Sequence, residues 1–246
     1  MFTVVAYNIE GGVGVTKGYR EYFFRGWRHF FPNESEQFAH IARFFDDRQI
    51  DIALISEIND IALKTNWTSH TKFISERCDL KHFKFFPTFR IRSLFQGGNA
   101  ILSRYPLISA ETIKLPGGCW SRYINKATFR HDDMEVAVFI THLSLGKKNR
   151  TQQIQAIADI IKQEKQPVVL GGDFNTTSDE EMTPLYAIGL KSTEMQHTYP
   201  SWKPFEKRDY ILVNQAFDES RGHVDTSIRF SDHLPIITEC NLNKFL

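Results

Sequence analysis

The segment from Pro167 to Thr177 constrains the fold of this chain more than any other. It reads Pro-Val-Val-Leu-Gly-Gly-Asp-Phe-Asn-Thr-Thr, an apolar run that ends in two glycines followed by Asp173 and Asn175. Such a run predicts a short buried strand, and catalytic groups collect at the tips of strands in open α/β sheets. Gly, Asp and Asn also form plain turns, so other parts of the chain must decide between a site and a turn.

The order of predicted elements indicates a layered α/β protein with mixed sheets, because strands outnumber helices and the helices recur singly between them. Helices are predicted over 33–49, 66–80 and 149–163, and a short one begins at Ser178. Asn33 with Glu36 and Ser178 with Glu181 have the spacing of capping boxes. Strands are predicted over 2–8, 52–56, 99–103, 108–115, 121–130, 135–141, 168–170, 210–213, 224–230 and 236–240.

Composition limits the class of protein. The chain has 246 residues and no Pro/Gly/Ser-rich linker or repeat, so we expect one domain over 1–246. The net charge of +1 excludes a global basic field, although a local basic patch is compatible with it. Three distant cysteines form neither a disulfide framework nor a zinc motif, and no membrane span or signal peptide is evident. We therefore expect a cytoplasmic monomer without integral membrane association.

Polar side chains recur where predicted strands begin or end. Each has an ordinary structural explanation when taken alone, but together they indicate one site at a sheet edge, because such groups are costly to bury unpaired. They are Asn8, Glu57, His142, Asp173, Asn175, Asp209, Asp232 and His233. Hard oxygen ligands without cysteine favour Mg²⁺, with Mn²⁺ as a substitute. The remaining Asp and His residues can form pairs in which a carboxylate orients an imidazole. These groups suit attack of water at phosphorus.

Short motifs at these positions resemble those of the endonuclease/exonuclease/phosphatase superfamily, in the order in which that family has them. The two most specific are Gly171-Gly-Asp-Phe-Asn175 and Ser231-Asp-His233. The others are Val5-Ala-Tyr-Asn8, Ile55-Ser-Glu57, Gly98-Asn-Ala-Ile-Leu-Ser-Arg104-Tyr-Pro106, Thr141-His142-Leu143 and Arg208-Asp209-Tyr-Ile. The resemblance implies a four-layered α/β sandwich of the deoxyribonuclease I type, in which two packed mixed sheets are flanked by helices and the site lies at one sheet edge.

The resemblance also implies roles for individual residues. Glu57 would bind the divalent cation, with Asn8 beside it and Asp232 contributing. Asp173 would position or deprotonate the attacking water, and Asn175 would donate a hydrogen bond to a phosphate oxygen. His233, oriented by Asp209, would contact the phosphate as base or stabiliser, and His142 would be the second imidazole and a candidate acid. The choice of acid and base stays open. Arg122 matches a phosphate-contacting arginine, or is an exposed strand residue.

The substrate is less constrained than the chemistry. Ser56 and Arg208 depart from the commoner family residues, and Arg208 adds a cation near the site. Cationic loops suit a nucleic-acid backbone, and candidates are Lys147-Lys-Asn-Arg150 and the 20–29 segment (Arg20, Arg25, Trp27, Arg28, His29). Lys84–Arg92 also interleaves basic residues with phenylalanines, which suits phosphate contact together with base stacking. We therefore expect a phosphoester substrate and rank a nucleic-acid phosphodiester first. The alternatives are a small or lipid-derived phosphoester, as in sphingomyelinases, and an inactive phosphate-binding module.

Overall fold

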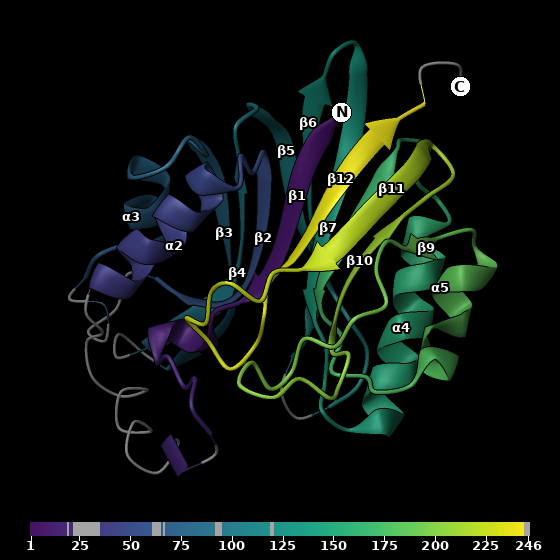
Figure 1. Cartoon of the computed structure of the whole chain (residues 1–246). Helices are drawn as coiled ribbons and strands as arrows, with labels where there is room; N and C mark the ends of the chain where they lie inside the picture. The colour runs from purple at the N-terminus through teal and green to yellow at the C-terminus, as the bar shows by residue number, and fades with distance from the viewer. Residues whose placement is uncertain are drawn as a thin grey trace.

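Two mixed β-sheets packed face to face form the centre of the molecule, and helices cover their outer faces (Figure 1). The computed structural model describes residues 1–18, 20–21, 35–60, 65, 67–91, 95–118 and 121–243. The first sheet has the strand order β11 (Phe217–Val224), β12 (Ile236–Leu242), β1 (Phe2–Asn8), β2 (Ile52–Asn59), β4 (Phe95–Ser103) and β3 (His82–Ile91). The second has the order β5 (Leu107–Lys114), β6 (Tyr123–His131), β7 (Met134–His142), β8 (Val168–Asp173), β10 (Asp209–Val213) and β9 (Lys191–Ser192).

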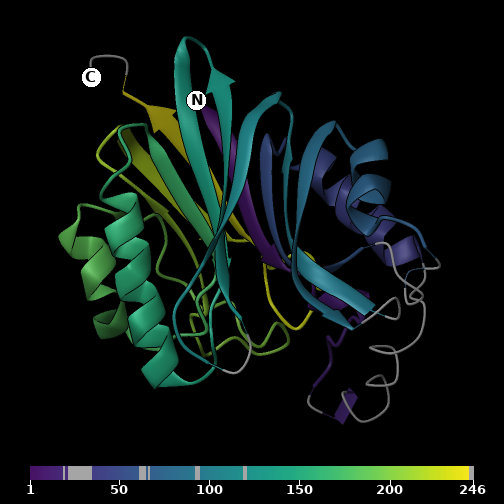
Figure 2. The same ribbon diagram turned by 180° about the vertical axis from the view of Figure 1, so that it is seen from behind.

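The helices lie in two outer layers, which Figure 2 shows from behind. The first sheet is covered by α2 (Ser35–Asp47) and α3 (His70–Glu76). The second sheet is covered by α4 (Lys147–Ile161) and α5 (Thr183–Ala187). Short 3-10 turns follow β1 at Glu10–Gly12 and precede α5 at Asp179–Met182. The molecule is therefore a four-layered α/β sandwich, which confirms the fold expected from the sequence. None of the described helices is long and apolar enough to cross a membrane.

Strand β1 shows how the apolar pattern produces these layers. Successive side chains on a strand point to opposite faces. Val4 and Ala6 accordingly enter the core between the two sheets, whereas Val5 and Tyr7 enter the core beneath α2 and α3. All four side chains are buried, as expected for a central strand that is covered on both faces. A near-continuous apolar run is thus required here in place of strict alternation.

One parallel strand pair lies near the centre of each sheet, and these pairs position the site. β1 is parallel to β2, with Asn8 beside Ser56, and β7 is parallel to β8, with His142 beside Asp173. A parallel pair needs a crossover connection, which contains α2 in the first case and α4 in the second. Because parallel strands end at the same edge, the polar residues that follow them are brought together.

Three local expectations from the sequence were wrong or incomplete. The strand expected over 224–230 lies earlier, as β11, because the Asp225 carboxylate accepts a hydrogen bond from the Ser227 amide at 2.8 Å and turns the chain. Ser178 makes no capping hydrogen bond, since Glu181 pairs instead with Arg150. The helix expected over 66–80 is shorter and begins after Ser69, whose hydroxyl accepts from the Lys72 amide. The expected cap at Asn33 lies outside the described residues.

Strand β3, which was not predicted from the sequence, has Pro87 in its middle. Proline lacks an amide hydrogen and is found in sheets mainly on edge strands or at bulges. Both conditions hold here, since β3 is the edge of the first sheet and its register shifts between Pro87 and Phe89. Part of the aromatic character of this segment serves packing, because Phe86 is buried in the core between the sheets.

The two glycines that follow the apolar run of β8 allow this strand to approach both the opposite sheet and its neighbour β7 closely. A Cβ atom on Gly171 would lie 2.7 Å from Leu54 of the opposite sheet. Gly172 has a φ of 129°, and a Cβ atom there would lie 2.1 Å from the Thr141 carbonyl oxygen on β7. The glycine pair is therefore a packing requirement that places Asp173 at the junction of the sheets.

We expect Gly172→Ala to lower the free energy of unfolding by about 2 kcal/mol or more, because both the backbone conformation and the β7 contact forbid a side chain. Urea unfolding followed by circular dichroism measures the change. Gly146→Ala is the control: a Cβ atom there meets no atom within 4 Å, and at this helix N-cap the cost is below about 1 kcal/mol. Equal stability of the Gly172→Ala variant and the native protein would contradict the close-approach argument.

Candidate active site

The strand-end residues expected from the sequence come together at one edge of the two sheets. Asn8, His142 and Asp173 end parallel strands, and Asp209 begins β10 opposite Asp173. His233 precedes β12, which is antiparallel to β1 and so brings it to the same edge. Both sheets therefore supply the cluster.

Asn8 joins carboxylates from the two sheets. Its amide Nδ2 donates to Glu57 Oε1 at 3.1 Å and to Asp173 Oδ2 at 3.0 Å, while its Oδ1 accepts from the Glu10 amide at 3.0 Å. The contacts on both sides fix the orientation of the amide group, since carboxylates require a donor and a backbone N–H requires an acceptor. Asn8 thus presents nitrogen to the carboxylates, and in this geometry it positions them.

A bulge in β2 sets the direction of the Glu57 side chain. The register of β2 against β4 shifts between Ile55 and Ile58, and Glu57 has a left-handed φ of 57°. A bulge redirects a side chain at the cost of local strain, and bulges are common next to active sites. Glu57 consequently points toward the second sheet, with 39% of its side chain exposed.

Asp173 and Asn175 form a compact turn. The Asn175 amide donates to Asp173 Oδ1 at 2.8 Å, and Asn175 also has a left-handed φ, of 53°. Asn175 Nδ2 donates to the Leu143 carbonyl at 3.0 Å, which leaves one of its two amide hydrogens for a ligand. Asp173 therefore keeps Oδ2 facing Asn8 and the histidines. Asn175 is held beside Asp173 by its backbone amide and by the Leu143 carbonyl.

His233 is oriented by a chain of buried groups. Its Nδ1 donates to Asp209 Oδ2 at 2.7 Å, and the same oxygen accepts from the Thr198 hydroxyl at 2.6 Å. His233 Nε2 lies 3.9 Å from Asp173 Oδ2. The expected pairing of Asp209 with a histidine is thus present and involves His233. Thr198 had no signal in the sequence, because its loop approaches β10 only in the folded chain.

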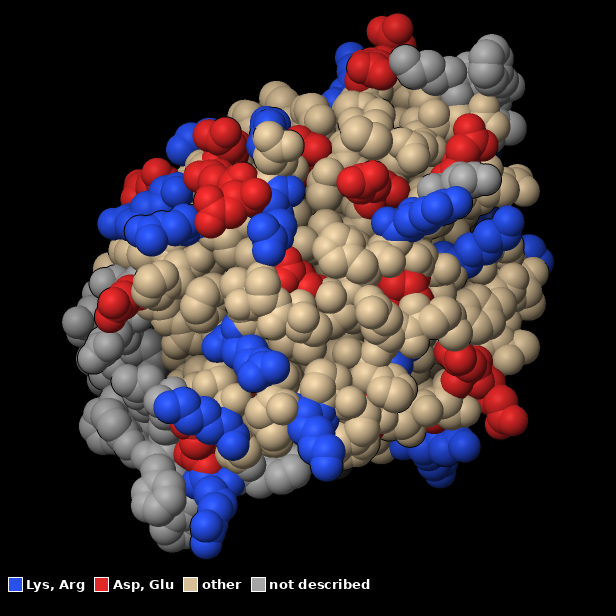
Figure 3. All heavy atoms as spheres, in the orientation of Figure 1, with Lys and Arg blue, Asp and Glu red and all other residues tan. Residues whose placement is uncertain are grey.

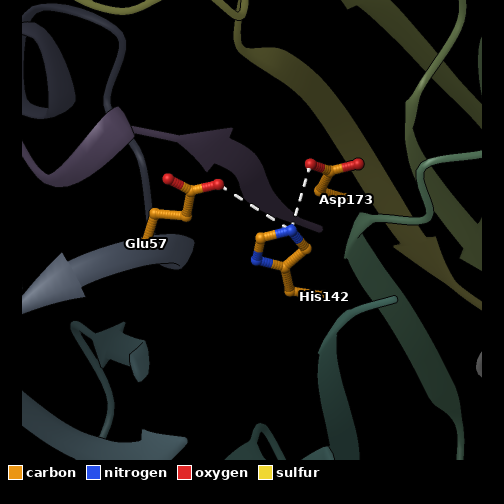
Figure 4. A group of neighbouring side chains, drawn as sticks. All are labelled: Glu57, His142 and Asp173. Atoms are coloured by element: carbon orange, nitrogen blue, oxygen red, sulfur yellow. Dashed lines mark ion pairs between the residues drawn. The ribbon is translucent and has the colours of Figure 1, made fainter. Parts of the chain in front are cut away.

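His142 lies between the carboxylates of Glu57 and Asp173. Its Nε2 is 3.8 Å from Glu57 Oε1 and 3.6 Å from Asp173 Oδ2, and Figure 4 shows the ring nitrogen directed at both. The nearest ligand atoms of these three residues lie within 4.8 Å of one another, a spacing at which they could hold a metal ion. A mixed set of two carboxylates and one imidazole fits a divalent cation.

Asp232, the third expected metal ligand, is in neither group of described side chains whose ligand atoms lie within 4.8 Å of one another. Its Oδ1 accepts from the Ser231 hydroxyl at 3.1 Å. After burial, its charge is the main cause that raises the pKa of Glu57. Asp232 therefore acts electrostatically on the Glu57 carboxylate.

The two histidines have opposite protonation preferences. Burial lowers the pKa of His142 well below its ordinary value, and the nearby charges of Arg122 and His233 lower it further. Burial also opposes protonation of His233, but Asp209 and Asp173 outweigh it and raise the pKa of His233 well above its ordinary value. The surroundings therefore favour the neutral form of His142 and the protonated form of His233.

Asp173 has a pKa suited to proton transfer near neutrality. Burial raises its pKa to about 7, while the His233 charge opposes the increase. A general base is most effective when its pKa lies near the working pH. Asp173 thus meets the electrostatic requirement for accepting a proton from water.

Arg122 has an unused donor. Its Nε is buried and has no hydrogen-bond partner among the described residues. Burial lowers the pKa of its guanidinium, and the charges of Asp173 and Glu57 partly restore it. A buried unpaired donor beside a carboxylate cluster indicates that an anionic ligand completes the site.

A cavity of ≈ 160 Å³, here called the side cavity, opens from the catalytic cluster. Glu57, Arg122 and His142 form its catalytic end, and Glu10 lies in its wall. Glu10 was missed in the sequence, although its place two residues after Asn8 and before Gly11-Gly12 was a usable signal. Its side chain is only 4% exposed.

The basic segments expected to contact nucleic acid are only partly available for that role. Arg150 is buried and forms a bidentate ion pair with Glu181. Arg208 pairs with Glu206 at 2.6 Å and lies over the Tyr199 ring. On the face drawn in Figure 3, basic side chains form separate groups between acidic and uncharged ones. Arg25, Trp27, Arg28, His29 and Arg92 lie outside the described residues.

Comparison with known proteins agrees with this architecture. Residues 5–233 match the model of the Endonuclease/Exonuclease/phosphatase family. A protein of that family from Beutenbergia cavernae superposes with a TM-score of 0.76 at 21% identity, covering 98% of this chain and 72% of its own. One from Leptotrichia buccalis gives 0.74 at 16% identity, covering 98% of this chain and 100% of its own.

A third solved structure, named mannosyl-6-phosphatase Bt3783 from Bacteroides thetaiotaomicron, gives a TM-score of 0.72 at 17% identity and covers 98% of this chain and 99% of its own. These identities establish likeness of fold. The search of curated proteins gave no match. Because the family model spans nearly the whole chain, including every residue of the cluster, the chain belongs to the endonuclease/exonuclease/phosphatase family of phosphoester hydrolases.

Proposed function

We propose that the protein is a divalent-cation-dependent hydrolase of small phosphoesters. The observation that supports this most is the placement of three groups beside side chains that could hold a metal ion. They are His233 with a raised pKa, Asp173 with a pKa of about 7, and the Arg122 Nε, which has no hydrogen-bond partner among the described residues. Stabilising developing charge on phosphate oxygens requires such an arrangement.

The divalent cation would be held by the Glu57 carboxylate, with His142 as the neighbouring ligand and Asp232 adding negative charge. Asp173, beside this pair, would stay off the ion and remain able to accept a proton. Mg²⁺ suits the oxygen donors, and Mn²⁺ tolerates the imidazole as well. When bound, the ion supplies Lewis-acid polarisation of a phosphoryl oxygen. Asn8 donates hydrogen bonds to the carboxylates of Glu57 and Asp173 and so holds them close together.

The protein groups divide the proton transfers between them. Asp173 accepts a proton from water as the new P–O bond forms. The imidazolium of His233 donates a hydrogen bond to the phosphate, and Arg122 neutralises a second oxygen. The electron pair of the old P–O bond goes to the leaving oxygen, which takes the proton that the His233 imidazolium gives up. His142, held neutral by its surroundings, is a poorer source of that proton than His233.

The side cavity favours a small phosphoester over the nucleic-acid phosphodiester ranked first from the sequence. It opens from the catalytic end and encloses ≈ 160 Å³, comparable to the cavity of about 150 Å³ that holds a benzene molecule. Meanwhile Arg150, one of the basic residues expected to contact a phosphate backbone, is paired with Glu181, and Arg208, expected to add a cation near the site, is paired with Glu206. An inactive binding module is disfavoured because every catalytic position has a competent side chain.

We expect hydrolysis of p-nitrophenyl phosphate or its bis-ester with Mg²⁺ or Mn²⁺, and none with EDTA. Asp173→Ala lowers kcat by about 10²-fold or more, because it removes the base. Cleavage rates of supercoiled plasmid and single-stranded DNA, compared with those of the p-nitrophenyl esters, rank the substrate classes. Faster cleavage of DNA, with binding that weakens steeply as salt rises, would favour nucleic acid. Equal activity of Asp173→Ala and the native protein would remove the proposed mechanism.

Glu57→Gln should weaken Mg²⁺ binding by about tenfold or more, because an amide oxygen replaces a charged ligand. Calorimetric titration of the metal-free protein measures this independently of activity. Glu111→Gln is the matched control, since Glu111 is 55% exposed on β5, away from the site. Unchanged affinity in Glu57→Gln would place the ion elsewhere.

Asp209→Asn should lower the pKa of His233. Asp209 is the main cause that raises this pKa, so removing its negative charge makes the imidazolium lose its proton at a lower pH. Nitrogen-15 NMR titration of the metal-free protein follows both histidines. In the native protein His233 stays protonated and His142 neutral at pH 7. A neutral His233 at that pH would contradict the assigned roles.

A further inference from the structure

The loops that leave the catalytic edge from β7 and β8 are joined by side chains outside the catalytic cluster. The first, here called the β7 loop, covers residues 143–146 and follows His142 directly. The second, here called the β8 loop, covers residues 174–178 and contains Asn175. A displacement of one loop relative to the other therefore changes the position of a side chain in the site.

Apolar packing anchors only the beginning of the β7 loop. Leu143 is fully buried, whereas Leu145 is 72% exposed. A Cβ atom on Gly146 would meet no atom within 4 Å, so little surrounds the end of this loop. Because packing does not fix that end, hydrogen bonds must hold it.

Two buried side chains of α4 supply those hydrogen bonds. Gln153 Oε1 accepts from the Ser144 amide at 3.0 Å, and Gln153 Nε2 donates to the Ser144 hydroxyl at 2.9 Å. Arg150 Nη1 donates to the carbonyls of Ser144 at 3.2 Å and Leu145 at 2.6 Å. The backbone of the β7 loop is therefore held by α4 at two consecutive residues.

The same guanidinium holds the segment that follows β8. Arg150 Nε and Nη2 donate to the two carboxylate oxygens of Glu181 at 2.8 and 2.9 Å, and the two side chains are 7% and 6% exposed. A bidentate pair fixes geometry as well as charge. The Glu181 amide donates to the Ser178 carbonyl at 3.1 Å, and the Ser178 amide donates to the Thr176 hydroxyl at 3.2 Å. Glu181 is thus connected back to the residue beside Asn175.

The two loops also meet directly at the site. The Leu143 carbonyl accepts from Asn175 Nδ2 at 3.0 Å, and the Leu143 amide donates to the Asp173 carbonyl at 2.9 Å. The position of the Leu143 carbonyl therefore sets the direction of the Asn175 amide group and of its remaining N–H. Arg150 binds the next carbonyl along the chain, that of Ser144, so only one peptide unit separates the two contacts.

We propose that Arg150 and Glu181 are positioning residues, whose ion pair fixes the β7 loop against the β8 loop and so directs the Asn175 amide group at the substrate phosphate. The proposal rests on the proposed function for the contact with phosphate, whereas the coupling of the loops does not depend on it. It assigns to Arg150 an internal role in place of the nucleic-acid contact expected from the sequence.

NMR spectroscopy of the metal-free protein tests the positioning without catalysis. The side-chain amide signals of Asn175 are identified by their loss in Asn175→Asp. We expect Arg150→Lys and Glu181→Asp each to shift these signals, because both keep the charge but neither can form the bidentate pair and span the same distance. Arg130→Lys is the matched control. It alters an exposed arginine–glutamate pair, with Arg130 63% exposed, and should leave the signals in place.

Hydrolysis of p-nitrophenyl phosphate with Mg²⁺ tests the consequence for the reaction. Arg150→Lys should lower kcat by about tenfold or more and change KM by less than about threefold, because a misplaced group stabilises the transition state less. In an Asn175→Ala background the same substitution should lower kcat by less than about threefold, since the positioned group is already absent. A substitution that acted only on stability would lower kcat by the same factor in both backgrounds.

Circular dichroism and thermal unfolding verify that each variant is folded at the assay temperature. Glu181→Asp replaces Arg150→Lys in both measurements if the latter does not fold. Unchanged Asn175 signals in the folded variant, or an equal loss of kcat in both backgrounds, would overturn the positioning role. If the native protein hydrolyses no phosphoester, the proposed function fails and the NMR result alone decides whether the ion pair positions Asn175.

Discussion

The amide of Asn8 is the contact on which the site depends. One nitrogen donates to carboxylates from both sheets, Glu57 at 3.1 Å and Asp173 at 3.0 Å. Two like charges held this close repel each other, and a shared donor offsets part of that repulsion. Burial raises the pKa values of both carboxyl groups, and the Asn8 hydrogen bond partly offsets this increase for Glu57. The strand pairing that places Asn8 between them therefore contributes to the electrostatics of the site.

The same region concentrates backbone strain. Glu57 and Asn175 both have left-handed φ values, and Gly172 occupies a conformation that a side chain would exclude. The packed sheets around them supply the stability that offsets this strain, through three apolar cores that separate four layers. A rigid scaffold with strained tips is suited to holding catalytic groups in one geometry.

Much of the site was predictable because its residues lie at strand ends, where apolar runs stop abruptly. The convergence of Asn8, His142 and Asp173 followed from the run before each of them and from the rule that parallel strands share an edge. Thr198, Glu10 and the orientation of the Asn8 amide were not predictable, since each depends on a contact between segments distant in sequence or on a loop turn. In two places tertiary structure overrides a local sequence signal. Glu181 has the spacing of a capping box but pairs with Arg150. Pro87 lies within a strand, which is possible because that strand is at the edge of the sheet.

The pairing of β1 with β12 has a consequence for how the chain folds during synthesis. Phe2 lies opposite Cys240, so one side of the largely buried central strand β1 gains its partner only after the chain has been made as far as β12. Until then β1 exposes unpaired backbone groups and apolar side chains, a state that invites association with other chains. On the ribosome the first sheet is consequently completed last, and the catalytic edge, which needs His233 just before β12, cannot exist in any shorter nascent chain.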